Sequence, residues 1–196
     1  MTRPLLFLWL TFIPISGCGI FETRQPQPPQ QGRTDFQPPT APSVVVDNMT
    51  SAIGDKNVDN YLSCLSDTSF GGRPFSFVPA PDVFRQYQAI FASWDKNSEG
   101  AYFRSISTQS SATAAPALTL SSVTLVQQGS DSAQYNADYV LIWPSKVPGY
   151  PHQQFQGNLQ LYLGIDRNQN WSIYRWIDSR TGDSLTWGDM KARFSQ

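Results

Sequence analysis

Residues 158–178 read NLQLYLGIDRNQNWSIYRWID and carry the clearest structural signal in the chain. Apolar residues alternate with others from Leu159 to Ile165, and a second alternating run begins at Trp171. A period of two residues is typical of a half-buried strand, and the polar residues 166–170 between the runs favour a tight turn. The stretch therefore predicts an antiparallel hairpin.

The same period extends toward the N-terminus. Residues 118–125 and 135–143 predict two more strands, separated by the turn signal of residues 129–132. Within the second of these strands, Asp138 has the opposite parity to Tyr139, so we expect Asp138 to face solvent. Strands and turn signals of these lengths are typical of an antiparallel meander.

The final strand has aromatic residues on both of its predicted faces. Simple alternation places Trp171 and Ile173 on one face and Tyr174, Trp176 and Asp178 on the other. Both faces of the sheet can then be covered, one by helices and one by a partner or second subunit. A bland two-sided core remains an equal alternative. Asp178 stands at the end of this strand, where a carboxylate ordinarily caps a turn.

Helical spacing precedes the strands. Apolar residues recur every three or four positions in residues 45–53, 58–65 and 83–94, with Asp82 as the expected cap of the third segment. Residues 98–106 predict another helical turn or two, and the phenylalanines within 70–77 a short strand or hairpin. Helices followed by strands indicate an α+β domain with the helices on one face of the sheet.

The N-terminus has a different character. Arg3 precedes the apolar run LLFLWLTFIPI, and two small residues then come directly before Cys18. This layout is typical of a secretory signal peptide. A transmembrane helix needs about 20 apolar residues, which this run, interrupted by Pro14, does not supply.

Ile15-Ser16-Gly17-Cys18 resembles the lipobox of bacterial lipoproteins. The resemblance implies cleavage of residues 1–17 as a signal peptide and acylation of Cys18, with palmitate among the acyl groups. Cys18 would then anchor the protein in the membrane of the cell envelope. Gly19 stands where an inner-membrane retention signal would have Asp, so the resemblance favours the periplasmic face of the outer membrane.

Residues 18–42 are rich in proline and glutamine and poor in apolar side chains. Such a composition is typical of a semi-rigid tether, which in polyproline geometry reaches at most roughly 70 Å. We therefore expect a tether over residues 18–42 and one globular domain over residues 43–196, as one domain suits a chain of this length.

Charge and cysteine usage exclude several classes of protein. The formal net charge is −1, which is not the basic footprint that nucleic-acid binding requires. The six Trp, eight Tyr and twelve Phe residues are ample for a globular core. If Cys18 carries lipid, Cys64 has no partner for an intramolecular disulfide, and its apolar setting predicts a buried thiol.

Recognisable catalytic and metal-binding motifs are lacking in the sequence. His152 is the single histidine, so a zinc site is not expected, and a lone loop histidine is usually just solvated. No nucleophile elbow, HExxH or phosphate-binding loop appears. The sequence predicts no catalytic set, no metal site and no cofactor.

The order of elements suggests a family. Asp59 and Tyr61 follow the first helical pattern, Leu65-Ser66-Asp67 forms a turn, and Trp171, Ile173 and Trp176 mark the closing strand. Over residues 43 to 180 this resembles the cone-shaped fold of nuclear transport factor 2 (NTF2), SnoaL-type cyclases and ketosteroid isomerase. The resemblance implies N-terminal helices packed on a curved antiparallel sheet of four to six strands. A lipocalin-like barrel is the nearest competitor, but it needs eight strands.

We expect the domain to bind a small ligand or an envelope protein partner, or to form a homodimer, without catalysing a reaction. The expected surface is an aromatic patch of Tyr139, Trp143, Tyr174 and Trp176. One alternative is an enzyme similar to ketosteroid isomerase or SnoaL that acts on a small apolar substrate. A buried acidic group facing the cone would favour this alternative. The other is a structural accessory subunit of a membrane complex.

Overall fold

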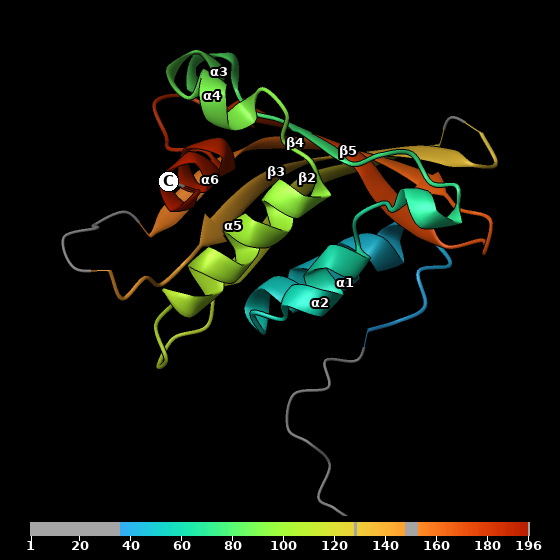
Figure 1. Cartoon of the computed structure of the whole chain (residues 1–196), viewed down its shortest axis with the longest axis horizontal. Helices are drawn as coiled ribbons and strands as arrows, with labels where there is room; N and C mark the ends of the chain where they lie inside the picture. The colour runs from blue at the N-terminus through green and yellow to red at the C-terminus, as the bar shows by residue number, and fades with distance from the viewer. Residues whose placement is uncertain (1–35, 128, 148–152, 196) are drawn as a thin grey trace, which may run out of the picture. The chain divides into compact units, whose positions relative to one another are not determined.

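The computed structural model describes residues 36–127, 129–147 and 153–195. Cys18, most of the predicted tether and His152 lie outside the described residues. The remaining residues form one unit, in which helices pack on a five-stranded sheet (Figure 1).

The sheet has the strand order β1-β5-β4-β3-β2. Strands β2 to β5 form the predicted antiparallel meander, whereas β1 pairs with β5 in parallel. The expected curved sheet of four to six strands is therefore confirmed, but it is mixed and not purely antiparallel. The strand bounds are β1 (Ser76–Val78), β2 (Ala117–Gln127), β3 (Ser132–Ile142), β4 (Gln154–Ile165) and β5 (Trp171–Arg180).

The helices fall into two groups. Figure 1 shows α1, α2 and α5 across one face of the sheet, while α3, α4 and α6 gather at one end of it. The helix bounds are α1 (Pro42–Gly54), α2 (Val58–Ser63), α3 (Pro81–Gln86), α4 (Gln88–Phe91), α5 (Lys96–Thr108) and α6 (Trp187–Phe194), with a 3-10 turn at Thr68–Phe70.

Two helical predictions differ from the structure in their boundaries. The helix expected over residues 83–94 breaks at Tyr87, whose backbone has φ −124° and ψ 39°, and its first turn follows Ala80, not an Asp82 cap. Helix α5 is longer than expected because the Asp95 side chain accepts a hydrogen bond from the Ser98 backbone N–H and starts the helix at Lys96.

A β-bulge in β5 changes the predicted parity of that strand. Leu163 pairs with Ile173 and the adjacent Tyr162 pairs with Arg175, so Tyr174 is the extra residue. After the bulge, Trp176 and Asp178 point to the same inner face as Ile173 and are buried. The alternation predicted from sequence, with Trp176 and Asp178 on the Tyr174 face, is therefore wrong beyond residue 174.

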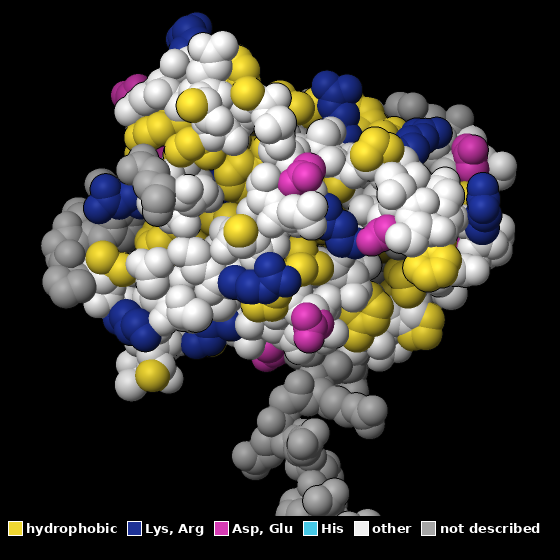
Figure 2. All heavy atoms as spheres, viewed as in Figure 1, with side chains coloured by type: hydrophobic (Ala, Val, Ile, Leu, Met, Phe, Trp, Pro, Cys, Tyr) yellow, Lys and Arg dark blue, Asp and Glu magenta, His cyan; other side chains and the backbone are white. Residues whose placement is uncertain are grey.

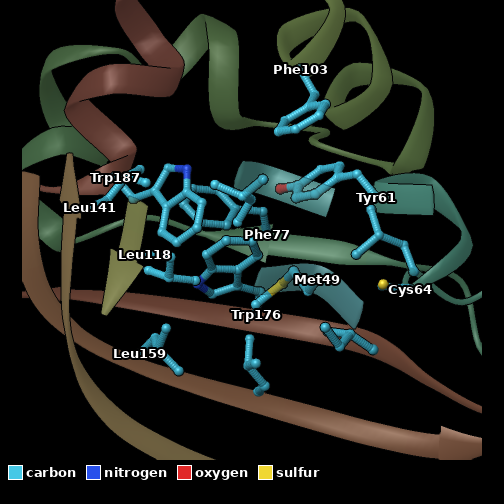
Figure 3. Packing of buried hydrophobic residues seen from close by; sticks show 14 of the residues in the cluster. Met49, Tyr61, Cys64, Phe77, Phe103, Leu118, Leu141, Leu159, Trp176 and Trp187 are labelled. Carbon is cyan, nitrogen blue, oxygen red and sulfur yellow. The ribbon is translucent and has the colours of Figure 1, made fainter. Parts of the chain in front are cut away.

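The hydrophobic core lies between the helices and the inner face of the sheet (Figure 3). Tyr61 stacks on Phe103 with ring centroids 3.9 Å apart, which joins α2 to α5. Trp176 meets Trp187 edge to face at 4.4 Å, which joins β5 to α6. Cys64 is buried as predicted, and burial raises the pKa of its thiol to about 12, which disfavours the thiolate form.

Residues 36–41, assigned to the tether from sequence, contact the domain. The buried side chain of Asn48 accepts a hydrogen bond from the Gln37 backbone N–H at 3.0 Å and donates one to the Gln37 carbonyl at 2.7 Å. The Pro39 carbonyl accepts the Trp171 N–H at 2.7 Å. The packed part of the chain thus begins no later than Phe36, which packs against the core. Within the described ranges, no helix combines the length and apolar character needed to cross a membrane.

These contacts predict the protease-resistant start of the domain. Limited proteolysis of the wild type should yield a fragment beginning near residue 36. In Asn48→Ala the cut should move toward Pro42, and the free energy of unfolding should fall by about 1–2 kcal/mol as two hydrogen bonds are lost. The matched control is Thr50→Ala, because the Thr50 hydroxyl bonds only within α1, to Val46. A wild-type fragment that begins after residue 42 would contradict the prediction.

Candidate functional site

A carboxylate lies at the centre of the core. Four residues on one face of α5, Glu99, Tyr102, Phe103 and Ile106, are buried at helical spacing. Three of them are apolar or aromatic, but Glu99 is an acid with no solvent exposure. A buried charge is tolerated only when it is paired and hydrogen-bonded, so the surroundings of Glu99 define a polar site inside the domain.

The counter-charge comes from α6. Lys191 has no solvent exposure either, and its Nζ contacts both carboxylate oxygens of Glu99. Two further donors hold the carboxylate: the Tyr61 hydroxyl donates to Oε1 at 2.7 Å and the Trp94 indole to Oε2 at 2.6 Å. In Figure 3 the Tyr61 hydroxyl points into the core between helices and sheet.

Aromatic rings surround the ammonium group of Lys191. We call these rings the lysine cage. A cation over the face of a ring within about 6 Å of its centroid is attracted to it, and by about 2 kcal/mol or more once water is excluded. The distances from Nζ to the ring centroids are 4.0 Å for Phe77, 4.3 Å for Trp176, 5.2 Å for Tyr102, 5.5 Å for Trp94 and 6.0 Å for Trp187.

A second buried carboxylate lies next to the cage. The Asp178 side chain accepts hydrogen bonds from the Tyr139 hydroxyl at 2.8 Å and from the Gly188 backbone N–H at 2.7 Å. The Tyr139 oxygen in turn accepts a hydrogen bond from the Trp187 backbone N–H at 2.7 Å. Asp178 therefore holds the first turn of α6, which agrees with the capping role expected for a carboxylate at this strand end, and it does so from a buried position.

Burial shifts the pKa values of the interior groups. It raises the pKa of Asp178, although the hydrogen bonds from Gly188 and Tyr139 oppose the shift. It lowers the pKa of Lys191, and the Glu99 carboxylate opposes that shift. Burial and the nearby Asp178 both raise the pKa of Tyr139. The interior thus favours neutral forms except where an ion pair compensates.

Carboxylates, lysine and tyrosine can act as general acids and bases, but the Glu99 and Asp178 carboxylates are already hydrogen-bonded to other groups of the chain. A general acid or base must come within hydrogen-bond reach of its substrate. Here both oxygens of Glu99 and both oxygens of Asp178 are engaged by groups of the chain itself. Lys191 fills the space between Glu99 and the rings. In this conformation the site binds an ammonium group, which is that of Lys191.

The four aromatic residues predicted to form one patch are separated. Tyr139, Trp143 and Trp176 are buried on the inner face, whereas Tyr174 is half-buried on the outer face of the sheet. The structure therefore corrects the predicted single patch. Trp143 packs on Phe103, and Trp176 is a wall of the lysine cage. Asp138 is exposed, as its parity predicts.

Neither Glu99 nor Lys191 is predicted as a site residue from the sequence. Two signals point to α6: Thr186 and Asp189 form a capping box, and Trp187, Met190 and Phe194 recur at helical spacing. The burial of Glu99 and Lys191 has a weaker signal, because each stands three residues from a buried aromatic on its helix. Only the tertiary structure shows that the two charges meet.

Two surface grooves flank Trp94. One of about 510 Å³ is lined by Ile90, Trp94, Tyr102 and Phe194 among others, and one of about 500 Å³ by Phe77, Phe84 and Trp94 among others. Figure 2 shows hydrophobic side chains gathered in the region that α3 and α4 occupy in Figure 1. Both grooves reach the outer edges of cage rings. In the described part of the chain, no cluster of three His, Cys, Asp or Glu side chains is placed to hold a metal ion.

The fold is similar to solved structures of NTF2-like proteins. A candidate aromatic ring hydroxylase from Novosphingobium aromaticivorans has a TM-score of 0.55 at 11% identity, covering 76% of this chain and 92% of its own. A candidate scytalone dehydratase from the same species has 0.54 at 9%, covering 74% and 90%. A candidate dehydratase of the NTF2-like family from Streptomyces avermitilis has 0.53 at 11%, covering 71% and 93%.

No family model and no curated protein sequence matches the chain. The structural similarity, at such low identity, defines the fold alone. The chain has the α+β NTF2-like fold that its order of elements predicts.

The buried ion pair makes a prediction about stability. Lys191→Met should lower the free energy of unfolding by about 3–5 kcal/mol, because it leaves the Glu99 charge buried without its partner. Glu99→Gln/Lys191→Met should recover most of that loss, since no unpaired charge remains. Urea unfolding of both variants measures the difference. The control is Arg104→Met on the exposed side of α5, the helix that carries Glu99, for which we expect a change within about 0.5 kcal/mol. Equal losses in the single and double variants would contradict the ion-pair account.

Proposed function

We propose that the protein is a lipid-anchored lipoprotein of the cell envelope whose NTF2-like domain binds a small ligand or an envelope protein and does not catalyse a reaction. The lipobox-like sequence before Cys18 and the proline-rich segment after it support the anchor and the tether. Gly19 supports a position on the periplasmic face of the outer membrane.

The observation that carries the non-catalytic part is the occupied interior. Lys191, with no solvent exposure, fills the space beside Glu99, and the carboxylates that face the interior are hydrogen-bonded within the chain. A substrate would have to displace α6 before either acid could reach it. Even with α6 displaced, both carboxylates would keep hydrogen bonds from other elements: Glu99 from Tyr61 and Trp94, and Asp178 from Tyr139.

The outer face of the sheet is the surface that supports a protein partner or a homodimer. Helices α1, α2 and α5 pack on the opposite face (Figure 1). The rings of Tyr162 and Tyr174 lie 6.3 Å apart on the outer face, with the Arg73 guanidinium 4.6 Å from the Tyr174 ring and that of Arg175 5.9 Å from the Tyr162 ring. Tyrosine and arginine are enriched at the energetic centres of protein interfaces.

An enzyme remains the second candidate, because one observation favours it. Asp178 is a buried acid with a raised pKa, hydrogen-bonded to Tyr139, and ketosteroid isomerase combines a carboxylic acid and a tyrosine in an apolar pocket. Two of the similar structures are candidate dehydratases. A turnover that Asp178→Asn and Tyr139→Phe both abolish, in variants that remain folded, would favour this candidate over the binding module.

The anchor is tested by the acylated thiol. Wild-type chain expressed in a Gram-negative host should partition into detergent and fractionate with membranes, whereas Cys18→Ser should accumulate uncut or appear in the soluble fraction. Cys64→Ser is the matched control, because that thiol is buried in the core and should leave fractionation unchanged. Processed Cys18→Ser protein that still fractionates with membranes would refute the lipid anchor.

The outer face is tested by Tyr174→Ser. Loss of a central interface aromatic costs about 2 kcal/mol, so the affinity for the partner or for the second subunit should fall about thirtyfold, and less of the cross-linked complex should be recovered. Tyr87→Ser, which changes a half-buried tyrosine between α3 and α4, serves as the control. Circular dichroism checks that both variants fold. Equal recovery from a folded Tyr174→Ser variant would show that this face is not the binding surface.

A further inference from the structure

The site around Lys191 divides into an occupant and a receptor. The occupant is the Lys191 side chain of α6. The receptor consists of Glu99 and four cage rings from other elements: Phe77 in β1, Trp94 before α5, Tyr102 in α5 and Trp176 in β5. Trp187 is the one cage ring that α6 itself supplies.

Contacts that do not involve α6 hold the receptor in shape. Tyr61 and Trp94 fix the Glu99 carboxylate with hydrogen bonds from α2 and from the segment before α5. Phe77 packs edge to face on Trp176 at 5.6 Å, and Trp94 packs on Tyr102 at 6.1 Å. Since these side chains support one another, we expect the carboxylate and the cage to keep their geometry when the lysine is absent.

The chemistry of the receptor selects an ammonium group. Ring faces attract a cation through their quadrupoles, and aromatic cages are a common solution for ammonium ligands. Glu99 adds a single negative charge that an ammonium group neutralises with a hydrogen bond. The rings lie 4.0 to 5.5 Å from Nζ, which suits a compact ammonium group on an alkyl stem.

The position of α6 gives a route to this receptor. The groove of about 510 Å³ is lined by Trp94 and Tyr102, which are cage rings, and by Phe194 of α6. Helix α6 belongs to no strand pair, and residues 181–186 connect it to β5. The first three of these residues form an exposed turn with Gly182 at φ +61°, whereas the Leu185 carbonyl accepts the Gln156 N–H of β4 at 2.8 Å. Displacement of α6 would therefore break no ladder of the described sheet. It would break the hydrogen bonds from α6 to Asp178, Tyr139 and Tyr102 and would uncover the receptor rings on the side of the groove.

We propose that the interior of the cone is a binding pocket for a small alkylammonium compound, and that α6 closes it in the free protein by inserting Lys191 as an internal substitute for the ligand. This inference rests on the proposed function as a binding module, and it names the class of ligand. Since the internal lysine competes with the ligand, the apparent affinity of the wild type equals the intrinsic affinity of the open pocket multiplied by the fraction of molecules in which α6 is displaced.

Lys191→Ala in the full-length chain, purified in detergent, tests the proposal. The substitution removes three methylenes and the ammonium group, which n-propylammonium chloride replaces atom for atom. The neutral probe is 1-propanol, which has the same number of heavy atoms. We expect n-propylammonium to bind the variant at least about tenfold more tightly than 1-propanol binds it. We also expect n-propylammonium to bind the variant at least about tenfold more tightly than it binds the wild type, and to raise the melting temperature of the variant.

Two further variants separate recognition from simple cavity filling. Met190→Ala opens an apolar cavity at a buried neighbour on the same helix and should show no preference for n-propylammonium. Glu99→Gln/Lys191→Ala keeps the rings and should lose most of the preference. If Lys191→Ala does not fold without a probe, its refolding is compared in n-propylammonium and in 1-propanol. Recovery in n-propylammonium but not in 1-propanol supports the proposal.

Equal effects of n-propylammonium and 1-propanol on Lys191→Ala would overturn the proposal, as would no effect of either probe or recovery in both. These outcomes are distinct from failure of the proposed function. Turnover of a substrate would remove the non-catalytic interpretation without changing n-propylammonium binding, and soluble wild-type protein would remove the anchor alone.

Discussion

The domain is organised around a positive charge that is sealed from water. Moving an ammonium group into a protein interior costs several kcal/mol, and the cost is offset only if the group finds an opposite charge and favourable dipoles. Glu99 and the lysine cage supply both to Lys191, and in doing so they bring together α2, α5, α6, β1 and β5. The ion pair thus ties five elements of the fold to one point of the core.

Much of the fold follows from local patterns. Period-two alternation locates β2 to β5, because a strand with one buried face must alternate, and apolar spacing locates α1 and α2. Asp138 and Cys64 are likewise predictable, one from strand parity and one from its apolar setting. In each case the deciding interactions lie within a few residues along the chain.

The site is not predictable in this way, because it depends on contacts between distant residues. In the sequence, Glu99 and Lys191 resemble ordinary surface charges on amphipathic helices, and only the packing of α5 against α6 brings them together. The bulge at Tyr174 has no strong signature in the sequence, yet it turns Trp176 into the cage and Asp178 toward α6. One inserted residue therefore decides which aromatic rings face the interior and which remain on the outer face.

The place of α6 after all the other elements affects how the domain is made. A ribosome delivers the receptor residues from Tyr61 to Trp176 before it delivers Lys191. Until then Glu99 lacks the counter-charge that the finished core supplies, and an unpaired charge is costly to bury. Completion of the core is thus deferred until synthesis has passed Phe194. Burial of the Lys191 charge is therefore a late event in the life of the chain, because every ring of the receptor has been synthesised before it.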